Sequence, residues 1–293
     1  MTHDEIHQRA LGAYLGFAIG DALGATVAFM TPAEIQHRYG MHRDMVGGGW
    51  FKLEPGQITD GAQMALALGQ SIIDSDGWNV TATADAFAAW FKSKPVDVGN
   101  TCRLGIQRYI TDGTLAGPPN EDDHGNGACM RNLPLALATL HDDDAFTRAT
   151  REQCHLTHHH PLSDAATLAL GRMTHALIRG GGIKGCRAEA NRLIGAFPVF
   201  RFDPYPKRAS GHIVESVQTV LYAFFRSDSF ESCVTEVVNH GEDAATNGAL
   251  GGMLAGAAYG VAGIPAYWLK KLDKSIRRGI EAQTGALLRL AQM

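Results

Sequence analysis

Residues 58–73 read Ile58-Thr59-Asp60-Gly61-Ala62-Gln63-Met64-Ala65-Leu66-Ala67-Leu68-Gly69-Gln70-Ser71-Ile72-Ile73, a polar turn that leads into a strongly helical run. Thr59 and Asp60 stand where an N-cap belongs, and Gln63 follows Asp60 at the spacing of a capping box. The run behind them is apolar on nearly every side, which is typical of a central, buried helix. We therefore expect the rest of the chain to be built around this helix, with the chemistry at its first turn.

A second segment of the same kind lies near the far end of the chain and reads Gly241-Glu242-Asp243-Ala244-Ala245-Thr246-Asn247-Gly248. It is again a short run of acids and a hydroxyl that leads into a helix of small residues. Two buried helix starts, each with an aspartate and a threonine oxygen, could face one another across a metal ion.

The first helix is expected to begin almost at residue 2, because Thr2 and Glu5 form a capping box. We expect it to run into a loop at residues 20–24, where Asp21 either lines a site or caps a turn. Glycines recur at every fourth residue of this helix and of the helix that follows Thr246, so each helix should let another backbone approach closely. These glycines are Gly12, Gly16 and Gly20 in the first helix, and Gly248, Gly252, Gly256 and Gly260 in the second.

The composition predicts one large domain over residues 1–293 and argues against several classes of partner. A net charge of −4 without any Lys/Arg-rich run argues against nucleic acid or an anionic membrane as the main partner. Five scattered cysteines without a C-x-x-C pair predict reduced thiols in a cytoplasmic protein. The apolar run 11–20 is short and cut by glycines, so we expect neither a signal peptide nor a transmembrane segment.

Helical patterns cover most of the chain and alternating strand patterns are nearly absent, so we predict an all-α fold with roughly a dozen helices. Thr31-Pro32-Ala33-Glu34 is a strong start signal for a short helix that ends at Tyr39. Further caps are expected at Asn79, Asn100 or Thr101, Asp142–Asp144 and Ser163, and further helical patterns cover residues 187–194, 213–225, 230–238 and 275–293.

Two loops and one helix end carry polar residues that could bind a ligand. Asp97 and Asn100 lie in a loop after a predicted helix. Residues 125–128 put two glycines around an asparagine, where bare N–H groups can hold phosphate, although such a turn is a weak signal by itself. Cys154 and His158 have the spacing of a zinc pair, but no second pair follows, and a polar helix end at a binding cleft is the preferred interpretation.

In order and spacing, these segments resemble the ADP-ribosylglycohydrolase family over essentially the whole chain. Within that family the chain is most similar to the branch from nitrogen-fixing bacteria that acts on dinitrogenase reductase. The segments that carry the resemblance are Gly20-Asp21-Ala22-Leu23-Gly24, Thr59-Asp60, Gly125-Asn126-Gly127 with Met130-Arg131, Thr157-His158, and Asp243 with Thr246.

The resemblance implies an all-helical hydrolase with two Mn²⁺ or Mg²⁺ ions, which cleaves the N-glycosidic bond between ADP-ribose and a modified arginine. Oxygen ligands suit these ions better than zinc. Asp97 matches the acid that pairs with the target guanidinium, and Asp60 is the second catalytic candidate. The implied metal ligands are Thr59, Asp60, Asp243 and Thr246, and the implied ADP-ribose contacts are Asn100, Gly125, Asn126, Gly127, Ala128, His158 and His212. Complexes with PII-type nitrogen signalling proteins are also implied.

The chain departs from the family pattern at positions of this same site. Small uncharged residues stand where the family has ligand-type side chains, and His212 stands where it has a tyrosine. Two divalent ions would bring four positive charges, against which only Asp60 and Asp243 remain as matched carboxylates. Because uncompensated buried charge costs several kcal/mol, we expect metal binding that is weak, limited to a single ion, or absent. The replaced positions are Gly61, Ala62, Ala245 and Ala28.

Three hypotheses about function follow from these residues. The first is a working hydrolase that uses one ion. The second, which we favour, is a hydrolase scaffold with little or no activity that still binds ADP-ribose. The third is a regulatory protein that acts only through partner surfaces, such as those that bind PII-type proteins.

Overall fold

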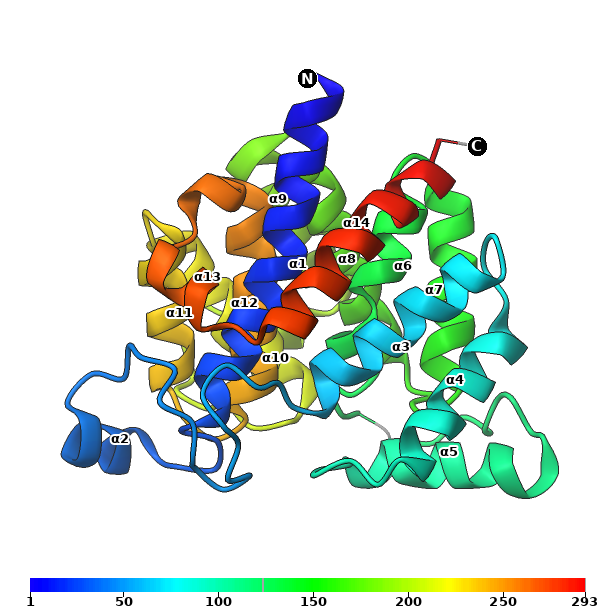
Figure 1. Cartoon of the computed structure of the whole chain (residues 1–293), viewed down its shortest axis with the longest axis horizontal. Coiled ribbons are helices and arrows are strands. Elements are labelled where there is room, and N and C mark those ends of the chain that lie inside the picture. Colours follow the sequence, from blue (N-terminus) through cyan, green and yellow to red (C-terminus); the bar gives the residue numbers. More distant parts are fainter. Residues whose placement is uncertain (123, 293) are drawn as a thin grey trace.

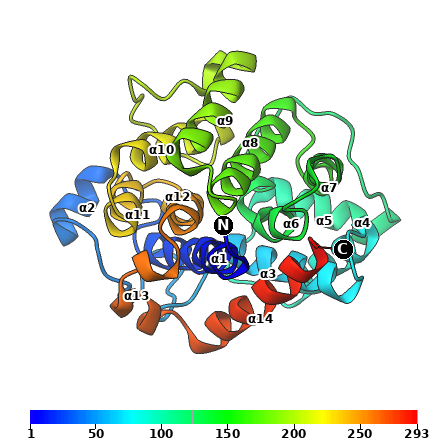
Figure 2. The ribbon, with the colours of Figure 1, turned by 90° about the horizontal axis from the view of Figure 1, so that it is seen from above.

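Two glycine-rich helices, α1 (His3–Ala25) and α12 (Ala244–Tyr259), pack antiparallel at the centre of the molecule (Figures 1 and 2). The structure is a computed structural model that describes residues 1–122 and 124–292. A Cβ on Gly16 would overlap the carbonyl oxygen of Gly252, and one on Gly20 would overlap that of Gly248. The two backbones therefore touch, and the predicted close approach of both helices is one and the same contact.

This pair, rather than the helix at residues 58–73, is the element around which the others gather. Helix α3 (Asp60–Asp74) buries one face and leaves Leu66, Ala67 and Ile73 partly exposed. The prediction that it is the buried centre was therefore wrong. Its apolar positions look continuous in sequence because alanine and glycine fit either a buried or a half-exposed helical face.

Helix α1 does not end in a loop at residues 20–24, as the sequence suggested, but continues to Ala25. Gly20 and Gly24 are helical and lie directly against the backbone of α12 at Gly248 and Ala244. The glycines are there for close packing, which the sequence pattern alone does not distinguish from a turn.

Most predicted caps are confirmed. Thr2 and Thr31 form capping boxes with Glu5 and Glu34, and the side chains of Asn79 and Asp142 cap their helices. The cap of α5 is Gly99 instead of Asn100 or Thr101, and that of α8 is His160 instead of Ser163. The remaining helices are α2 (Pro32–Tyr39), α4 (Val80–Lys92), α5 (Asn100–Asp112), α6 (Leu133–Ala138), α7 (Asp143–His155), α8 (Pro161–Ile178), α9 (Gly182–Ala196), α10 (Ile213–Arg226), α11 (Phe230–Asn239), α13 (Ala266–Lys271) and α14 (Lys274–Leu290).

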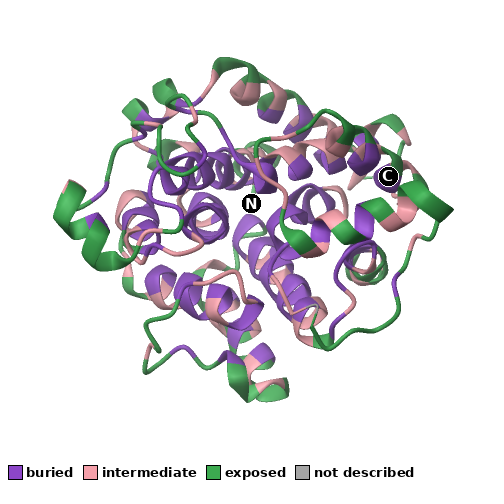
Figure 3. Ribbon diagram, turned by 90° about the horizontal axis from the view of Figure 1, so that it is seen from below, coloured by how far each residue is buried: buried purple, intermediate pink, exposed green. Residues whose placement is uncertain are grey.

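The all-α prediction is confirmed: the described residues form 14 α-helices, three short 3₁₀ turns, and no strand beyond two isolated bridges. One main apolar core runs from α1 to α14, with exposed residues concentrated at the periphery (Figure 3). The five cysteines are free and buried. Within the described residues, no helix is both long and apolar enough to cross a membrane.

The glycine contact gives a direct test of what holds the fold. Gly16→Ala should lower the free energy of unfolding by at least about 1–3 kcal/mol, because the added methyl group must push α12 away from α1. Gly279→Ala in α14 is the matched control, since a Cβ there meets nothing within 4 Å. It should leave stability unchanged or raise it by up to about 1 kcal/mol. Equal losses from the two substitutions in chemical denaturation would show that the α1–α12 contact is not special.

Candidate ligand-binding cleft

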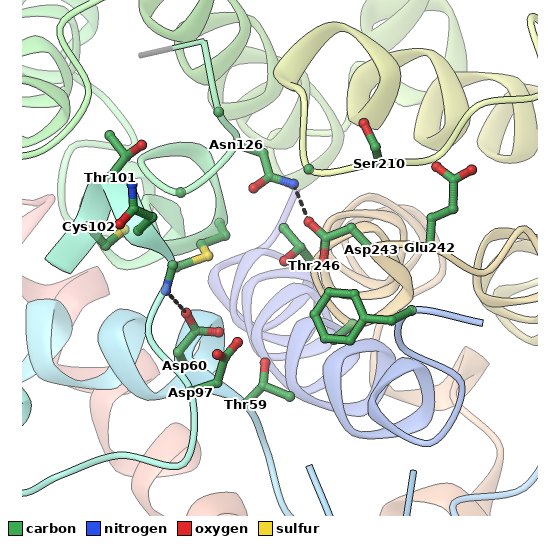
Figure 4. Close-up of a pocket in the computed structure, with 18 of the residues that line it drawn as sticks. Thr59, Asp60, Asp97, Thr101, Cys102, Asn126, Ser210, Glu242, Asp243 and Thr246 are labelled. Carbon is green, nitrogen blue, oxygen red and sulfur yellow. Dashed lines mark hydrogen bonds between the residues drawn. The ribbon is translucent and has the colours of Figure 1, made fainter. Parts of the chain in front are cut away.

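The starts of α3 and α12 face one another across a cavity of about 550 Å³ (Figure 4). Thr59, Asp60 and Asp97 lie on one side of it, and Asp243 and Thr246 lie on the other. The predicted juxtaposition of the two helix starts is therefore present. The other lining residues are Phe29, Phe51, Gly99, Asn100, Thr101, Cys102, Gly125, Asn126, Gly127, Met130, His158, Ser210, Gly211, Glu242 and Ala245.

Asp21 caps α3 from the neighbouring helix α1. Its buried carboxylate accepts hydrogen bonds from the backbone N–H of Thr59 at 2.6 Å, the Thr59 hydroxyl at 2.9 Å and the N–H of Ala62 at 3.2 Å. It is not among the residues that line the cavity, so of the two readings of Asp21 the capping role holds. Neither Thr59 nor Gln63 caps the helix with its own side chain, and the predicted capping box was wrong.

The carboxyl groups on the α3 side have raised pKa values. Burial, followed by the nearby charges of Asp97, Asp21 and Asp243, raises the pKa of Asp60 to about 8. Burial also raises the pKa of Asp97, which is half-buried beside it (Figure 4). The oxygens of Asp60 accept from the N–H groups of Gly61 at 3.0 Å and of Gly99 at 3.4 Å. A cation in the cavity would lower both pKa values, because a nearby positive charge favours the carboxylate form.

On the opposite side, Asp243 holds the glycine-asparagine loop against the start of α12. The Asn126 side-chain amide donates to Asp243 at 2.7 Å and to the Ser216 hydroxyl at 2.8 Å. The backbone N–H of Asn126 donates to Gly211 at 3.0 Å. Burial raises the pKa of Asp243, and the Asn126 hydrogen bond opposes that rise. The loop is thus fixed at both its backbone and its side chain.

The two glycines of this loop leave room for the ring of His158. A Cβ on Gly127 would lie 2.6 Å from His158 Cε1 and 2.8 Å from the Cys102 sulfur, and one on Gly125 would lie 3.1 Å from His158 Nε2. Burial, and then the charge of Arg131, lower the pKa of His158 to about 3, so its ring is neutral. Glycine is therefore needed at both positions so that the His158 ring can pack against this loop at the wall of the cleft.

Arg131 holds His158 in place through Thr157. It is fully buried, stacks on the Phe87 ring at 4.6 Å and donates to the side chain and backbone of Gln153. It also donates to the Thr157 hydroxyl at 2.8 Å, and that hydroxyl in turn pairs with His158 Nδ1 at 2.8 Å. This chain of contacts fixes the orientation of the imidazole, which explains why Met130-Arg131 and Thr157-His158 occur together.

Ten of the twelve sequence-predicted site residues line the cavity, and two do not. Ala128 is fully buried. His212 stacks on His124 at 4.1 Å, and its Nδ1 accepts from the Val214 N–H as the cap of α10. The ten lining residues are Thr59, Asp60, Asp97, Asn100, Gly125, Asn126, Gly127, His158, Asp243 and Thr246.

The sequence did not reveal Phe29 and Glu242 as lining residues. Both have a left-handed backbone, with φ of 65° and 51°, which is uncommon for side chains of this size. Phe29 N–H donates to the Glu242 carbonyl at 2.7 Å, and Glu242 N–H donates to Met30 at 2.8 Å. The pairing of two distant loops imposes this conformation. The only local signal is that Glu242 adjoins Asp243.

The donor set does not fit the two divalent ions that the resemblance implies. Only Asp60 and Asp243 face each other as carboxylates from the two helix starts, and the Thr59 hydroxyl proton is committed to Asp21. Across residues 1–122 and 124–292, no three His, Cys, Asp or Glu side chains gather in a way that could hold an ion. Ala28 instead packs in a small apolar cluster with Ala25 and Phe51. A two-ion centre would lack most of its ligands.

Comparisons with known proteins agree with the fold and the cleft. A family model described as ADP-ribosylglycohydrolase matches residues 2–293. The chain is 55% identical to the ADP-ribosyl-[dinitrogen reductase] glycohydrolase of Rhodospirillum rubrum, covering 99% of both chains. It is 30% identical to the ADP-ribosylarginine hydrolase Tri1 of Serratia proteamaculans, covering 94% of this chain and 78% of the relative. A solved structure, the "ADP-ribosylglycohydrolase-related protein complex", matches with a TM-score of 0.87 and 32% identity, covering 98% of this chain and 99% of that one.

Asp60→Asn should flatten the dependence of stability on pH. The pKa of Asp60 in the folded protein is about 8, above its ordinary value of 3.8, so the folded state keeps a proton that the unfolded state has released. The resulting stabilisation is complete below about pH 4 and is lost as the pH rises towards 8. Relative to the variant, the parent should therefore lose stability between about pH 5 and pH 8. Asp76→Asn, in the turn after α3, controls for the loss of one negative charge. Parallel denaturation profiles of parent and Asp60→Asn would contradict the assignment.

Proposed function

This chain belongs to the ADP-ribosylglycohydrolase family, and on that premise we propose that its cleft binds the ADP-ribose of a modified arginine while hydrolysing that bond little or not at all. One observation carries the proposal. The elements that would hold the ligand form an intact cleft, whereas the positions that would complete a two-ion centre carry no ligand side chains. Binding and chemistry are therefore separated in this chain.

The geometry of the cleft supports binding. Its volume of about 550 Å³ is within the range of sites for small molecules and cofactors. Gly125 and Gly127 expose backbone without a Cβ, which suits the close approach of a diphosphate. Asn126 and the neutral His158 add polar groups without a fixed charge, and both are held by further hydrogen bonds. A ligand would thus find a floor that is already ordered.

The protonation of the cleft acids supports low hydrolytic activity. Cleavage of an N-glycosidic bond develops positive charge at the anomeric carbon, which carboxylates or metal-oriented groups must stabilise. A proton on Asp60, whose pKa is about 8, removes much of that stabilisation at neutral pH. Divalent ions would restore it, but only Asp60 and Asp243 of the four lining acids stand at the helix starts, whereas Asp97 and Glu242 lie on loops and Asp97 is assigned below to the guanidinium.

Asp97 is the residue that we assign to the arginine side of the ligand. It lies on the loop between α4 and α5, beside Asp60, and is half-buried at the cavity. A carboxylate can bind a guanidinium through two parallel hydrogen bonds. The target would be an ADP-ribosylated arginine protein, with dinitrogenase reductase as the first candidate because the R. rubrum relative is named for it. A complex with a PII-type protein stays a prediction.

Two titrations test the binding proposal. Calorimetry should detect ADP-ribose binding to the full chain, and an ADP-ribosylated arginine peptide should also be captured. Asp97→Asn should weaken capture of the peptide by about tenfold, the loss of a charge-assisted contact, and leave free ADP-ribose affinity unchanged. Asp85→Asn, an exposed acid on α4 that accepts from Tyr109, is the matched control. No heat with ADP-ribose would refute the binding proposal, and equal loss of both ligands would refute the role of Asp97.

Restoring the missing ligands tests the proposed lack of activity. The parent should gain less than about one degree in Tm at millimolar Mn²⁺ and show no turnover, because its site cannot saturate. A Cβ on Gly61 would meet Met130 Sδ at 3.4 Å and Asp21 Oδ2 at 3.6 Å, so a side chain fits there beside an existing carboxylate. The combined variant Gly61→Asp, Ala62→Thr, Ala245→Asp and Ala28→Glu should lose stability without metal, regain a clear Mn²⁺ shift and recover cleavage.

A large Mn²⁺ shift or metal-dependent turnover in the parent would overturn the proposal. A restored variant that folds but shows no Mn²⁺ shift would show that the metal positions are wrongly assigned.

A further inference from the structure

We propose that a groove between α9 and the end of α10 is a second binding site, which takes a small molecule carrying phosphoryl groups with at least two negative charges. The groove has a volume of about 440 Å³ and shares no lining residue with the cleft. Arginines from three separate segments converge on it. They are Arg187 on α9, Arg201 on the connection that precedes α10, and Arg226 at the end of α10.

These three guanidinium groups form no ion pair within 4.0 Å and donate no side-chain hydrogen bond among the described residues, although the charge of Arg226 is close enough to help lower the pKa of Glu236. Arg192 on the same helix α9 behaves differently, because it pairs with Glu189 one turn away. Gathering unpaired like charges in one groove is unfavourable unless an anion offsets them. The arrangement is what an anion-binding site requires.

Aromatic rings fix two of the arginines in place. The Arg187 guanidinium lies 3.4 Å from the centre of the Phe225 ring, and the Arg226 guanidinium lies 5.0 Å from that of Tyr222. Phe202 stacks on Phe225 at 5.7 Å and extends the same platform. A guanidinium that rests on a ring keeps its in-plane N–H groups available for hydrogen bonds. Such preorganised planar donors match the oxygens of a phosphoryl group.

Charge and size define the ligand. The groove contains three arginines and one acid, Asp203, which leaves a net charge of +2. A phosphoryl group carries close to −2 at neutral pH. The volume is in the range of small-molecule sites. Because guanidinium groups already cover the faces of Tyr222 and Phe225, a nucleobase has no free ring there, and recognition falls on the phosphoryl oxygens.

The test titrates the full chain with inorganic pyrophosphate in a calorimeter. Removing one guanidinium should weaken binding by about tenfold in Arg187→Gln, Arg201→Gln and Arg226→Gln, the loss of one charge-assisted contact. Arg192→Gln, which removes the same charge from the same helix, should bind like the parent. Asp203→Asn should bind more tightly, because it removes the one repulsive charge in the groove.

Two further arms distinguish the groove from the cleft and define the ligand. Gly127→Ala, whose methyl group would overlap the His158 ring in the cleft, should leave pyrophosphate affinity unchanged. ADP should bind and adenosine should not. The proposal is overturned if the three groove variants bind like the parent, if Gly127→Ala abolishes binding, or if an acidic peptide binds where pyrophosphate does not. Because the cleft is itself proposed to accept a diphosphate, any pyrophosphate binding that survives the three groove variants and is lost in Gly127→Ala belongs to the cleft, and only the binding that the groove variants weaken supports the groove.

Discussion

The contact between the backbones of α1 and α12 is the constraint on which the rest of the structure depends. Glycine or alanine at every fourth position lets the two helices touch from Gly12 against Gly256 to Gly24 against Ala244. The end of α1 therefore lies beside the start of α12. Asp21, near the end of α1, then reaches across to cap α3. A single packing contact thus brings both helix starts of the cleft into register.

The electrostatics of the cleft follow from this arrangement. Burial beside the helix starts raises the pKa of Asp21, Asp60 and Asp243, and each acid is close enough to affect another. Asp21 and Asp243 accept short hydrogen bonds from neighbouring elements, whereas Asp60 accepts one from the adjacent Gly61 N–H and a longer one, at 3.4 Å, from Gly99. Additional carboxylates would increase the repulsion, so Gly61, Ala62 and Ala245 relieve a cost that a cation would otherwise have to offset. Under the proposed function, stability and metal-dependent chemistry would compete for the same positions.

The two proposed sites would recognise anions in different ways. The cleft offers glycine backbone, an amide and a neutral imidazole, which suit a ligand held by shape and hydrogen bonds. The groove at α9 and α10 offers three arginines that form no ion pair within 4.0 Å among the described residues, which suit a ligand selected by charge. Because the two sites share no lining residue, each can be altered without touching the other.

The helical class and most caps were predictable from the sequence alone, and ten of the twelve predicted site residues line the cavity. These features are local: the capping box at Thr2 or the glycines every fourth residue act within one helix, whatever lies beyond it. Most of the site residues came from the family resemblance, whose motifs occur in the same order and spacing over nearly the whole chain.

Which side chains from distant parts of the sequence meet could be seen only in the folded structure. Asp21 accepts from Thr59, the N-cap of α3, which lies 38 residues later in the sequence, and the glycines at residues 20–24 continue a helix because another backbone lies against them. The orientation of His212, the left-handed Phe29 and the convergence of Arg187 with Arg226 likewise depend on neighbours far away in sequence. A local pattern specifies what a side chain can do, whereas long-range packing specifies what it faces.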